Sequence, residues 1–281
     1  MSSYFPLLPN FRSNRFDFLV RSSLSLANYP NNILEENLVS KTTDKTDIFY
    51  YVYYLEDNFW KQYSKIKCEY GELIEIQRSE INLANDISIV VLPSKIQNLP
   101  TETRILPTPI SLKKDNSFVA DRCSFNFFID NYVSSFQGEY PFTLARAKTG
   151  SFFSFDLLNL GQEHIDCFLF LVNINTDART KQSDEICFYN PEKYNLIKKI
   201  KAYKNTYNII DMNNINLLKE SNDELTLITS SSITFIPIFI NIMRNKSEVQ
   251  ISVEHTHPPT ELFWGKEKLK AASKLKENWI F

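Results

Sequence analysis

The sequence predicts a mainly β protein: an antiparallel β-sandwich or barrel-like domain, with a strand-containing N-terminal region before it and a C-terminal helix after it. Aromatic residues are abundant, with 22 Phe and 14 Tyr among 281 residues, and bulky rings pack well on the pleated surface of strands. About nine short apolar or alternating segments follow one another between residues 123 and 253, as is typical of sandwiches and barrels.

The N-terminal region holds its own strand patterns. Residues 48–54 form the first strong pattern, with aromatic residues on both faces. Two further segments, 66–70 and 73–77, flank Gly71, and two strands around a glycine predict a hairpin. Residues 87–92 are mostly apolar, which indicates a buried strand.

Four prolines between residues 93 and 109 mark the best candidate for a domain boundary. Proline removes a hydrogen-bond donor and stiffens the chain, which favours an edge or a linker. We therefore expect a strand-rich region at 1–105, a β-sandwich domain at 106–265 and a C-terminal amphipathic helix at 266–281.

The expected strands of the second domain are short and divided by polar turns. They cover residues 123–129, 142–146, 151–155, 167–174, 185–189, 207–211, 225–229, 233–243 and 249–253. Residues 266–278 differ, because strong helix formers occupy them throughout. Leu269, Leu275 and Trp279 give this segment a narrow apolar stripe that predicts packing of a helix.

Charge and glycine content exclude several classes of function. The formal net charge is −2, whereas a dedicated nucleic-acid binder needs a basic face, so nucleic acid is not an expected partner. Only 5 glycines are present, and no two of them are close together. A P-loop, a dinucleotide-binding turn and a GxSxG nucleophile elbow therefore cannot be assembled.

Cysteine usage and hydropathy predict a cytoplasmic protein. The four cysteines form no CxxC pair, and their spacing suits neither a disulfide framework nor a zinc ribbon. Charged residues interrupt the first thirty positions, so no secretory signal is expected. The longest apolar run, 233–243, is about half a bilayer span, so no transmembrane segment is expected either.

The constellation with the most chemistry is Glu254-His255-Thr-His257, followed by Glu261. On a strand, residues two apart share a face, with Cα atoms roughly 6.6 Å apart, so both imidazoles could converge. His255 and His257 could hold a transition metal with Glu261 as third ligand, or act as acid and base supported by Glu254. The sequence identifies no cofactor, and a bound metal is a less favoured interpretation than none.

The same residues resemble the first metal motif of the cupin family, which has His-x-His and a Glu four residues later. The cupin pattern also has a glycine six residues before the first histidine, where this chain has Val249, and a second motif with another histidine downstream. No histidine follows His257. The family's fold and activity are therefore not transferred to this chain.

Three other groups carry weaker chemical signals. Glu139 and Tyr140, at a turn between two expected strands, could hydrogen-bond a polar ligand such as a sugar, although a simple hairpin connection is favoured. Cys167 follows His164 and Asp166, but a buried cysteine in a core strand is the favoured interpretation. Lysines and tyrosines are interleaved between Lys193 and Tyr207, a composition that can bind single-stranded nucleic acid or simply form a solvated face.

These observations favour a non-catalytic binding or assembly module that recognises a protein or glycan partner. One alternative is an enzyme whose acid–base or metal site is built on His255 and His257. The other is nucleic-acid binding through the stretch from Lys193 to Tyr207.

Overall fold

The computed structural model describes ten segments of the chain. They are residues 2–28, 47–110, 123–146, 151–156, 163–179, 183–189, 196–214, 226–231, 233–245 and 248–255. The chain divides into two compact units, and each takes a short segment from the other's stretch of sequence. Unit 1 comprises Met1–Phe11, Leu19–Arg146 and Ile174–Thr180; unit 2 comprises Arg12–Phe18, Ala147–Asn173 and Lys181–Phe281.

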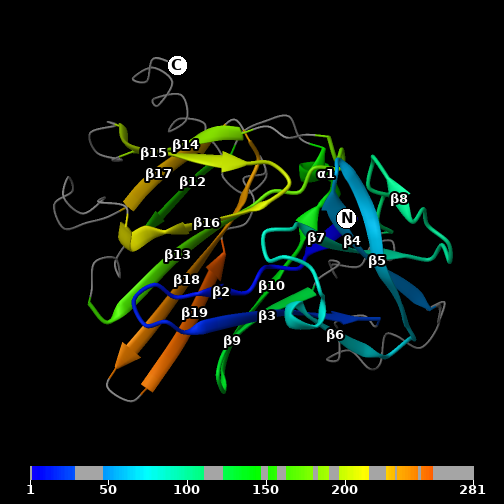
Figure 1. The fold of residues 1–281 in the computed structure, drawn as a ribbon, viewed down its shortest axis with the longest axis horizontal. Coiled ribbons are helices and arrows are strands. Elements are labelled where there is room, and N and C mark those ends of the chain that lie inside the picture. The colour runs from blue at the N-terminus through cyan, green and yellow to red at the C-terminus, as the bar shows by residue number, and fades with distance from the viewer. Residues whose placement is uncertain are drawn as a thin grey trace, which may run out of the picture. The chain divides into compact units, whose positions relative to one another are not determined.

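Unit 1 contains a six-stranded antiparallel sheet (Figure 1). Its strands, in spatial order, are β11 (Tyr140–Pro141), β1 (Ser3–Pro6), β7 (Ile89–Ser94), β4 (Ile48–Glu56), β5 (Phe59–Cys68) and β8 (Glu102–Thr103). Asp57 and Asn58 join β4 to β5 with φ values of 52° and 63°. A two-residue hairpin turn with both φ positive favours Asp and Asn at these positions, which explains the tight connection.

A second sheet of unit 1 contains five strands. In order they are β10 (Tyr132–Gly138), β9 (Cys123–Ile129), β3 (Leu19–Ala27) and β2 (Phe11–Arg12), with β6 (Leu73–Gln77) also paired to β3. Two short helices, η1 (Arg78–Glu80) and α1 (Phe142–Ala145), complete the regular elements of this unit.

Buried tyrosines and one tryptophan form much of the core of unit 1. Tyr50, Tyr53 and Trp60 are almost completely buried. Burial of a hydroxyl requires a hydrogen-bond partner, and the Tyr50 and Tyr53 hydroxyls donate to the carbonyl oxygens of Ala27 (3.0 Å) and Pro100 (2.6 Å). Aromatic residues on both faces of β4 are thus accommodated, because the polar ends reach backbone acceptors.

Two details of unit 1 differ from the sequence prediction. Residues 73–77 form the expected strand, but β6 pairs with β3 instead of β5, which places Ile76 beside Leu24, and both side chains are buried. Residues 142–145 form the helix α1, not a strand. Leu144 and Ala145 are good helix formers, and Pro141 before them has a φ of −57° that suits a helix start.

Unit 2 contains two four-stranded antiparallel sheets. One has the order β12 (Ser151–Asp156), β17 (Thr226–Ser231), β14 (Ser183–Tyr189) and β15 (Leu196–Tyr203). The other has the order β16 (Tyr207–Asp211), β13 (Ile165–Val172), β18 (Ile236–Asn245) and β19 (Glu248–His255), and the helix η2 (Met212–Asn214) follows β16. The prediction of a mainly β, antiparallel protein is confirmed.

A hydrophobic cluster contains residues of both sheets of unit 2. Leu169 and Leu171 of β13 pack with Ile186 and Phe188 of β14, and all four are completely buried. Every residue of β13 is buried, as expected for a nearly continuous apolar strand. This strand is therefore the centre of the unit.

The proline-rich segment, expected to be a boundary at residue 105, lies inside unit 1. The amide of Ile110 donates to the carbonyl oxygen of Pro93 (2.9 Å), and the carbonyl oxygen of Pro107 accepts from the Tyr4 hydroxyl (3.0 Å). The expected C-terminal helix, 266–281, lies outside the described residues. Among the described residues, no helix has the length and hydropathy needed to span a bilayer.

Candidate functional site

The backbone of the histidine constellation ends the last strand of unit 2. His255 pairs with Ile238 of β18, and Glu254 pairs with Phe239. His257 and Glu261 lie outside the described residues. The amide of Arg244 of β18 donates to the carbonyl oxygen of His164 (2.9 Å). Arg244 lies six residues after Ile238, the residue that pairs with His255. At about 3.3 Å per residue this corresponds to about 20 Å, so His164 cannot join a site at His255.

Among the described residues, no three His, Cys, Asp or Glu side chains lie close enough to hold a metal ion. The proposed site of His255, His257 and Glu261 stays a prediction, because two of its members are not described. It predicts close to one equivalent of transition metal in protein purified without an affinity tag, and loss of that metal in a His255→Ala, His257→Ala double variant. Elemental analysis of both proteins tests this, and less than about a tenth of an equivalent in the wild type would contradict it.

Glu139 and Tyr140 lie in the connection between β10 and α1. Tyr140 is in β11, pairs with Tyr4 of β1 and is completely buried, while Glu139 is half-buried. Tyr140 therefore contributes to the core of unit 1, and the prediction of a polar ligand at this pair gains no support from its position.

Cys167 is buried in β13, and His164 is exposed in the turn before that strand. Burial, with a further contribution from Asp166, raises the pKa of the Cys167 thiol to about 12. The thiol is therefore protonated at neutral pH, which disfavours a nucleophilic role.

The lysine–tyrosine stretch coincides in part with β15. Lys198, Lys199, Lys201 and Tyr203 are exposed there. Lys199 forms an ion pair with Glu185 (2.8 Å), and the ammonium of Lys201 lies 5.2 Å from the ring centroid of Tyr203. Part of the positive charge is thus neutralised within the sheet, and nucleic-acid binding stays a prediction.

A surface of unit 1 that the sequence did not single out has the most defined geometry. Two loop segments, around Ile105 and around Asp177, run side by side and form an isolated antiparallel bridge between these residues. The amide of Leu106 donates to the carbonyl oxygen of Thr176 (2.9 Å), and that of Ala178 donates to the carbonyl oxygen of Arg104 (2.9 Å).

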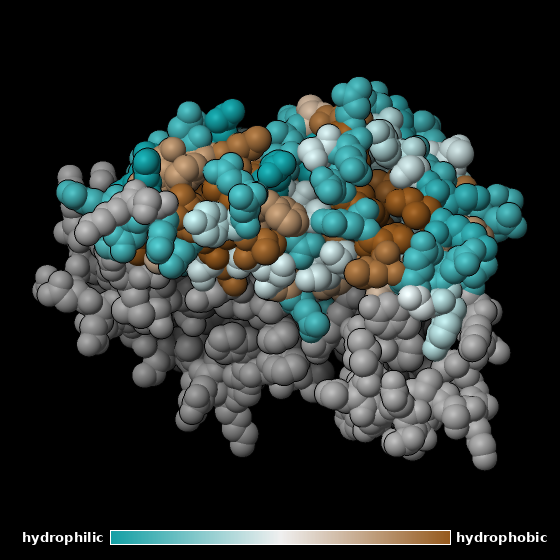
Figure 2. Space-filling view, turned by 90° about the horizontal axis from the view of Figure 1, so that it is seen from below, coloured by the Kyte–Doolittle hydropathy of each residue, from teal (hydrophilic) through white to brown (hydrophobic). Residues whose placement is uncertain are grey.

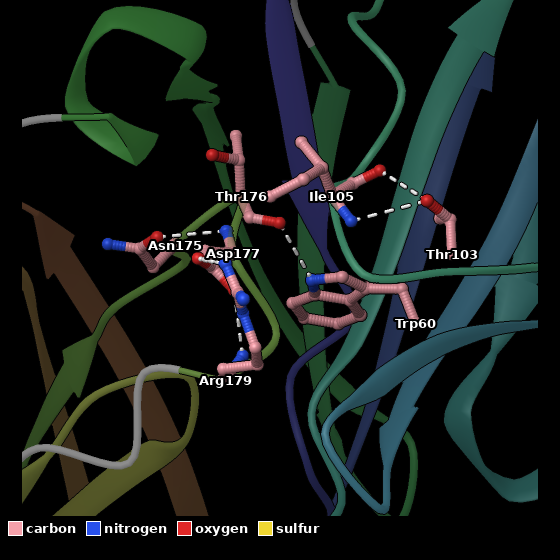
Figure 3. Close-up of polar contacts among 7 residues, drawn as sticks. All are labelled: Trp60, Thr103, Ile105, Asn175, Thr176, Asp177 and Arg179. Atoms are coloured by element: carbon pink, nitrogen blue, oxygen red, sulfur yellow. Dashed lines mark hydrogen bonds and ion pairs between the residues drawn. The ribbon is translucent and has the colours of Figure 1, made fainter.

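Trp60 contacts the segment around Asp177 through a hydrogen bond (Figure 3). Its indole is completely buried, and Nε1 donates to the carbonyl oxygen of Thr176 (3.2 Å). The hydroxyl of Thr103 donates to the carbonyl oxygen of Ile105 (2.9 Å) and accepts from its amide (3.2 Å). Loop backbone held at this many points is preorganised.

Arg104, Ile105, Asp177 and Arg179 form the outer layer of this platform, which we call the Arg104 surface. The guanidinium of Arg104 lies 5.1 Å from the ring centroid of Phe59. Arg179 donates to both oxygens of Asp177, at 3.0 and 2.8 Å, and Ile105, which is bridged to Asp177, is 50% exposed. One exposed apolar side chain and two cations thus belong to the same pair of bridged segments.

The electrostatics of the Arg104 surface leave it positively charged. Hydrogen bonds from Arg179, and more weakly the charge of Arg104, lower the pKa of Asp177, so this carboxylate is ionised at neutral pH. Two guanidiniums and one carboxylate give one net positive charge. The Asp177–Arg179 ion pair is exposed, so it contributes little to the stability of the fold. Its main effect is to orient the guanidinium of Arg179.

A second polar cluster lies in unit 2 around Asp166. Its Oδ2 accepts from the backbone amides of Asn14 (3.0 Å) and Arg15 (3.2 Å), and its Oδ1 accepts from Asn213 Nδ2 (2.8 Å). The neighbouring carboxylate of Asp211 accepts from the side-chain amides of Asn14 and Asn214. This cluster attaches Arg12–Phe18 to the rest of unit 2.

Sequence reasoning missed the residues of the Arg104 surface because they lie far apart in the chain. One local signal was present: Asn175 and Asp177 follow a largely apolar strand, and such residues favour turns. Arg104 lies in the proline-rich segment, where only a linker or an edge was expected.

Comparison with protein-family models, with curated proteins and with solved structures gives no match for this chain. No family is assigned. The functional interpretation therefore rests on the described residues alone.

Proposed function

We propose that the chain is a non-catalytic binding or assembly module, and that unit 2 is a β-sandwich. The shared hydrophobic cluster of the two sheets in unit 2 supports the sandwich. The observation that carries the binding function is the Arg104 surface, where an exposed isoleucine and two arginines lie on two hydrogen-bonded backbone segments.

The chemistry of this surface favours a protein partner with acidic groups. Arginine is enriched among the few residues that contribute most of the binding energy of protein interfaces. Ile105 offers an apolar anchor, and Arg104 and Arg179 offer planar donors for carboxylates. Because the backbone is held by Trp60 and by the paired loops, little entropy is lost when a partner binds.

Figure 2 shows hydrophobic residues visible between hydrophilic ones on one face of the protein. Single exposed apolar residues are normal on a surface and need no partner. What distinguishes the Arg104 surface is therefore the combination of Ile105 with two oriented cations, not exposure alone.

The test compares affinity capture from cells that contain the protein, using wild type, Ile105→Asp and Ile96→Asp as baits. Ile96 also lies in unit 1 and is 58% exposed, so its substitution is a matched control. We expect proteins captured by wild type and Ile96→Asp to bind Ile105→Asp about 10–100-fold more weakly, because the new carboxylate repels an acidic partner and removes the anchor.

Two outcomes would contradict the proposal: equal capture by Ile105→Asp and wild type, or equal loss with Ile96→Asp. Arg104→Ala gives a second measure, with an expected loss of about 10-fold. A glycan partner instead of a protein is tested by applying the same three proteins to immobilised glycans. Thermal unfolding checks that the exposed substitutions change stability by no more than about 0.5 kcal/mol.

A further inference from the structure

The strand β10 forms one end of the five-stranded sheet of unit 1. All seven of its residues pair with β9 in one continuous register, from Tyr132 opposite Ile129 to Gly138 opposite Cys123. Among the described residues, no strand pairs with the other side of β10. Within the described residues it is thus an edge strand, and its pairing with β9 contains no bulge.

The register shows which backbone groups face away from β9. Asp130 and Asn131 form a two-residue turn, and Asp130 has a φ of 50°. In such a hairpin the two residues that flank the turn, here Ile129 and Tyr132, form a hydrogen-bonded pair. Hydrogen-bonded and non-hydrogen-bonded pairs then alternate along the two strands. The amides and carbonyls of Val133 and Ser135 therefore point to the outer side, where another strand could bond them.

β10 lacks the features that normally keep edge strands from pairing. Edges are usually blocked by charged residues, proline or bulges. Its sequence is Tyr-Val-Ser-Ser-Phe-Gln-Gly, without any charge or proline, and Tyr132 and Val133 are 44% and 56% exposed.

Two edge strands of similar length in unit 2 make the contrast clear. β15 carries Lys198, Lys199 and Lys201, and β19 carries Glu248 and Glu254. Each of these strands would place like charges near one another if it paired with its own copy, which is unfavourable. β10 would meet no such repulsion.

We propose that β10 is a self-association edge, through which two copies of this chain pair their β10 strands antiparallel about a two-fold axis. In a two-fold symmetric dimer the same residues of both copies form the contact, and two antiparallel β10 strands meet this requirement. With the axis at Ser135, the two Ser135 residues lie opposite each other and form a polar cross-strand pair, and the outward groups of Val133 gain partners. This proposal is independent of the Arg104 surface.

A single pair of strands buries less surface than a standard interface of about 1,600 Å², so the dimer is expected to be weak and to depend on concentration. Sedimentation of the full chain should show an average mass that rises from 32.9 kDa toward twice that value as the concentration increases. Val133→Lys should keep the mass at 32.9 kDa over the same range, because it adds a charge to both sides of the contact.

Leu196→Lys is the matched control, since Leu196 is 44% exposed on the edge strand β15. It should associate like wild type. Ser135→Cys gives a second readout: opposed residues of a hydrogen-bonded pair have Cα atoms about 5.5 Å apart, within reach of a disulfide. Mild oxidation should therefore link the variant, but not wild type, into a covalent dimer.

The proposal is overturned if wild type stays at 32.9 kDa at every concentration, or if Val133→Lys associates as wild type does. It is also overturned if Leu196→Lys abolishes association, since charge in general would then be the cause. A dimer in which Ser135→Cys forms no covalent link would contradict pairing through β10. Loss of partner capture by Ile105→Asp bears only on the Arg104 surface and leaves these outcomes unaffected.

Discussion

Replacing Trp60 with alanine is expected to lower the free energy of unfolding by about 3–5 kcal/mol, the range typical of a large buried aromatic residue. The indole is completely buried in the core of unit 1. Its removal leaves a cavity next to the paired loops and removes the hydrogen bond to the carbonyl oxygen of Thr176. Equilibrium urea unfolding followed by circular dichroism measures the change.

Trp60→Phe separates the hydrogen bond from the volume. The carbonyl oxygen of Thr176 still accepts from the amide of Leu106 in this variant, so the loss of the indole donor itself should contribute only about 1 kcal/mol. We expect Trp60→Phe to be clearly more stable than Trp60→Ala. If the alanine variant unfolded at the urea concentration of wild type, the indole would not support the platform as described.

Replacing Asp166 with alanine is expected to lower the free energy of unfolding by about 2–3 kcal/mol. The carboxylate accepts three hydrogen bonds in a fully buried position, from the amides of Asn14 and Arg15 and from the side chain of Asn213. Alanine leaves three donors without their acceptor. Water can reach Asn14 and Arg15, which are exposed, so the loss is smaller than for a sealed site.

Asp166→Asn is the matched variant and should be milder. Its remaining oxygen can accept from the two backbone amides. Among the described residues, Asn213 Oδ1 is buried and has no hydrogen-bond partner. Rotation of the Asn213 amide would let Asn213 Oδ1 accept a hydrogen bond from the side-chain amide introduced at position 166. We therefore expect Asp166→Asn to lower the free energy of unfolding by less than half as much as Asp166→Ala does.

The surroundings of Asp166 also predict a pH dependence. Burial raises the pKa of Asp166 above its ordinary value of 3.8, the charge of Asp211 adds to this, and the amides of Arg15 and Asn14 oppose it. The folded state therefore holds the proton to a higher pH than the unfolded chain does. Stability falls as pH rises from 3.8 through the raised pKa, because the unfolded state loses its proton first.

Urea unfolding of wild type and Asp166→Asn over a pH series tests this sign. The stability of wild type relative to Asp166→Asn should decrease as pH rises through that window and be constant above it. A difference that increases with pH would show that the amides dominate over burial and would contradict the stated direction.

The fold class of this protein could be predicted from its amino-acid sequence. Period-two patterns and abundant aromatic residues depend on local backbone geometry, so strands such as β4, β13 and β18 could be placed from residues alone. The sparse glycines also excluded phosphate-binding loops, because those loops depend on residues that are close in sequence.

The pairing of the strands and the contacts between distant side chains could not be predicted from the sequence. β6 was recognisable as a strand, but its pairing with β3 depends on burying Ile76 beside Leu24, a contact between residues 52 positions apart. The Arg104 surface depends on a bridge between Ile105 and Asp177, 72 positions apart, and on Trp60 beneath it. Pairings of this kind are set by the packing of the whole unit, and no local pattern records them.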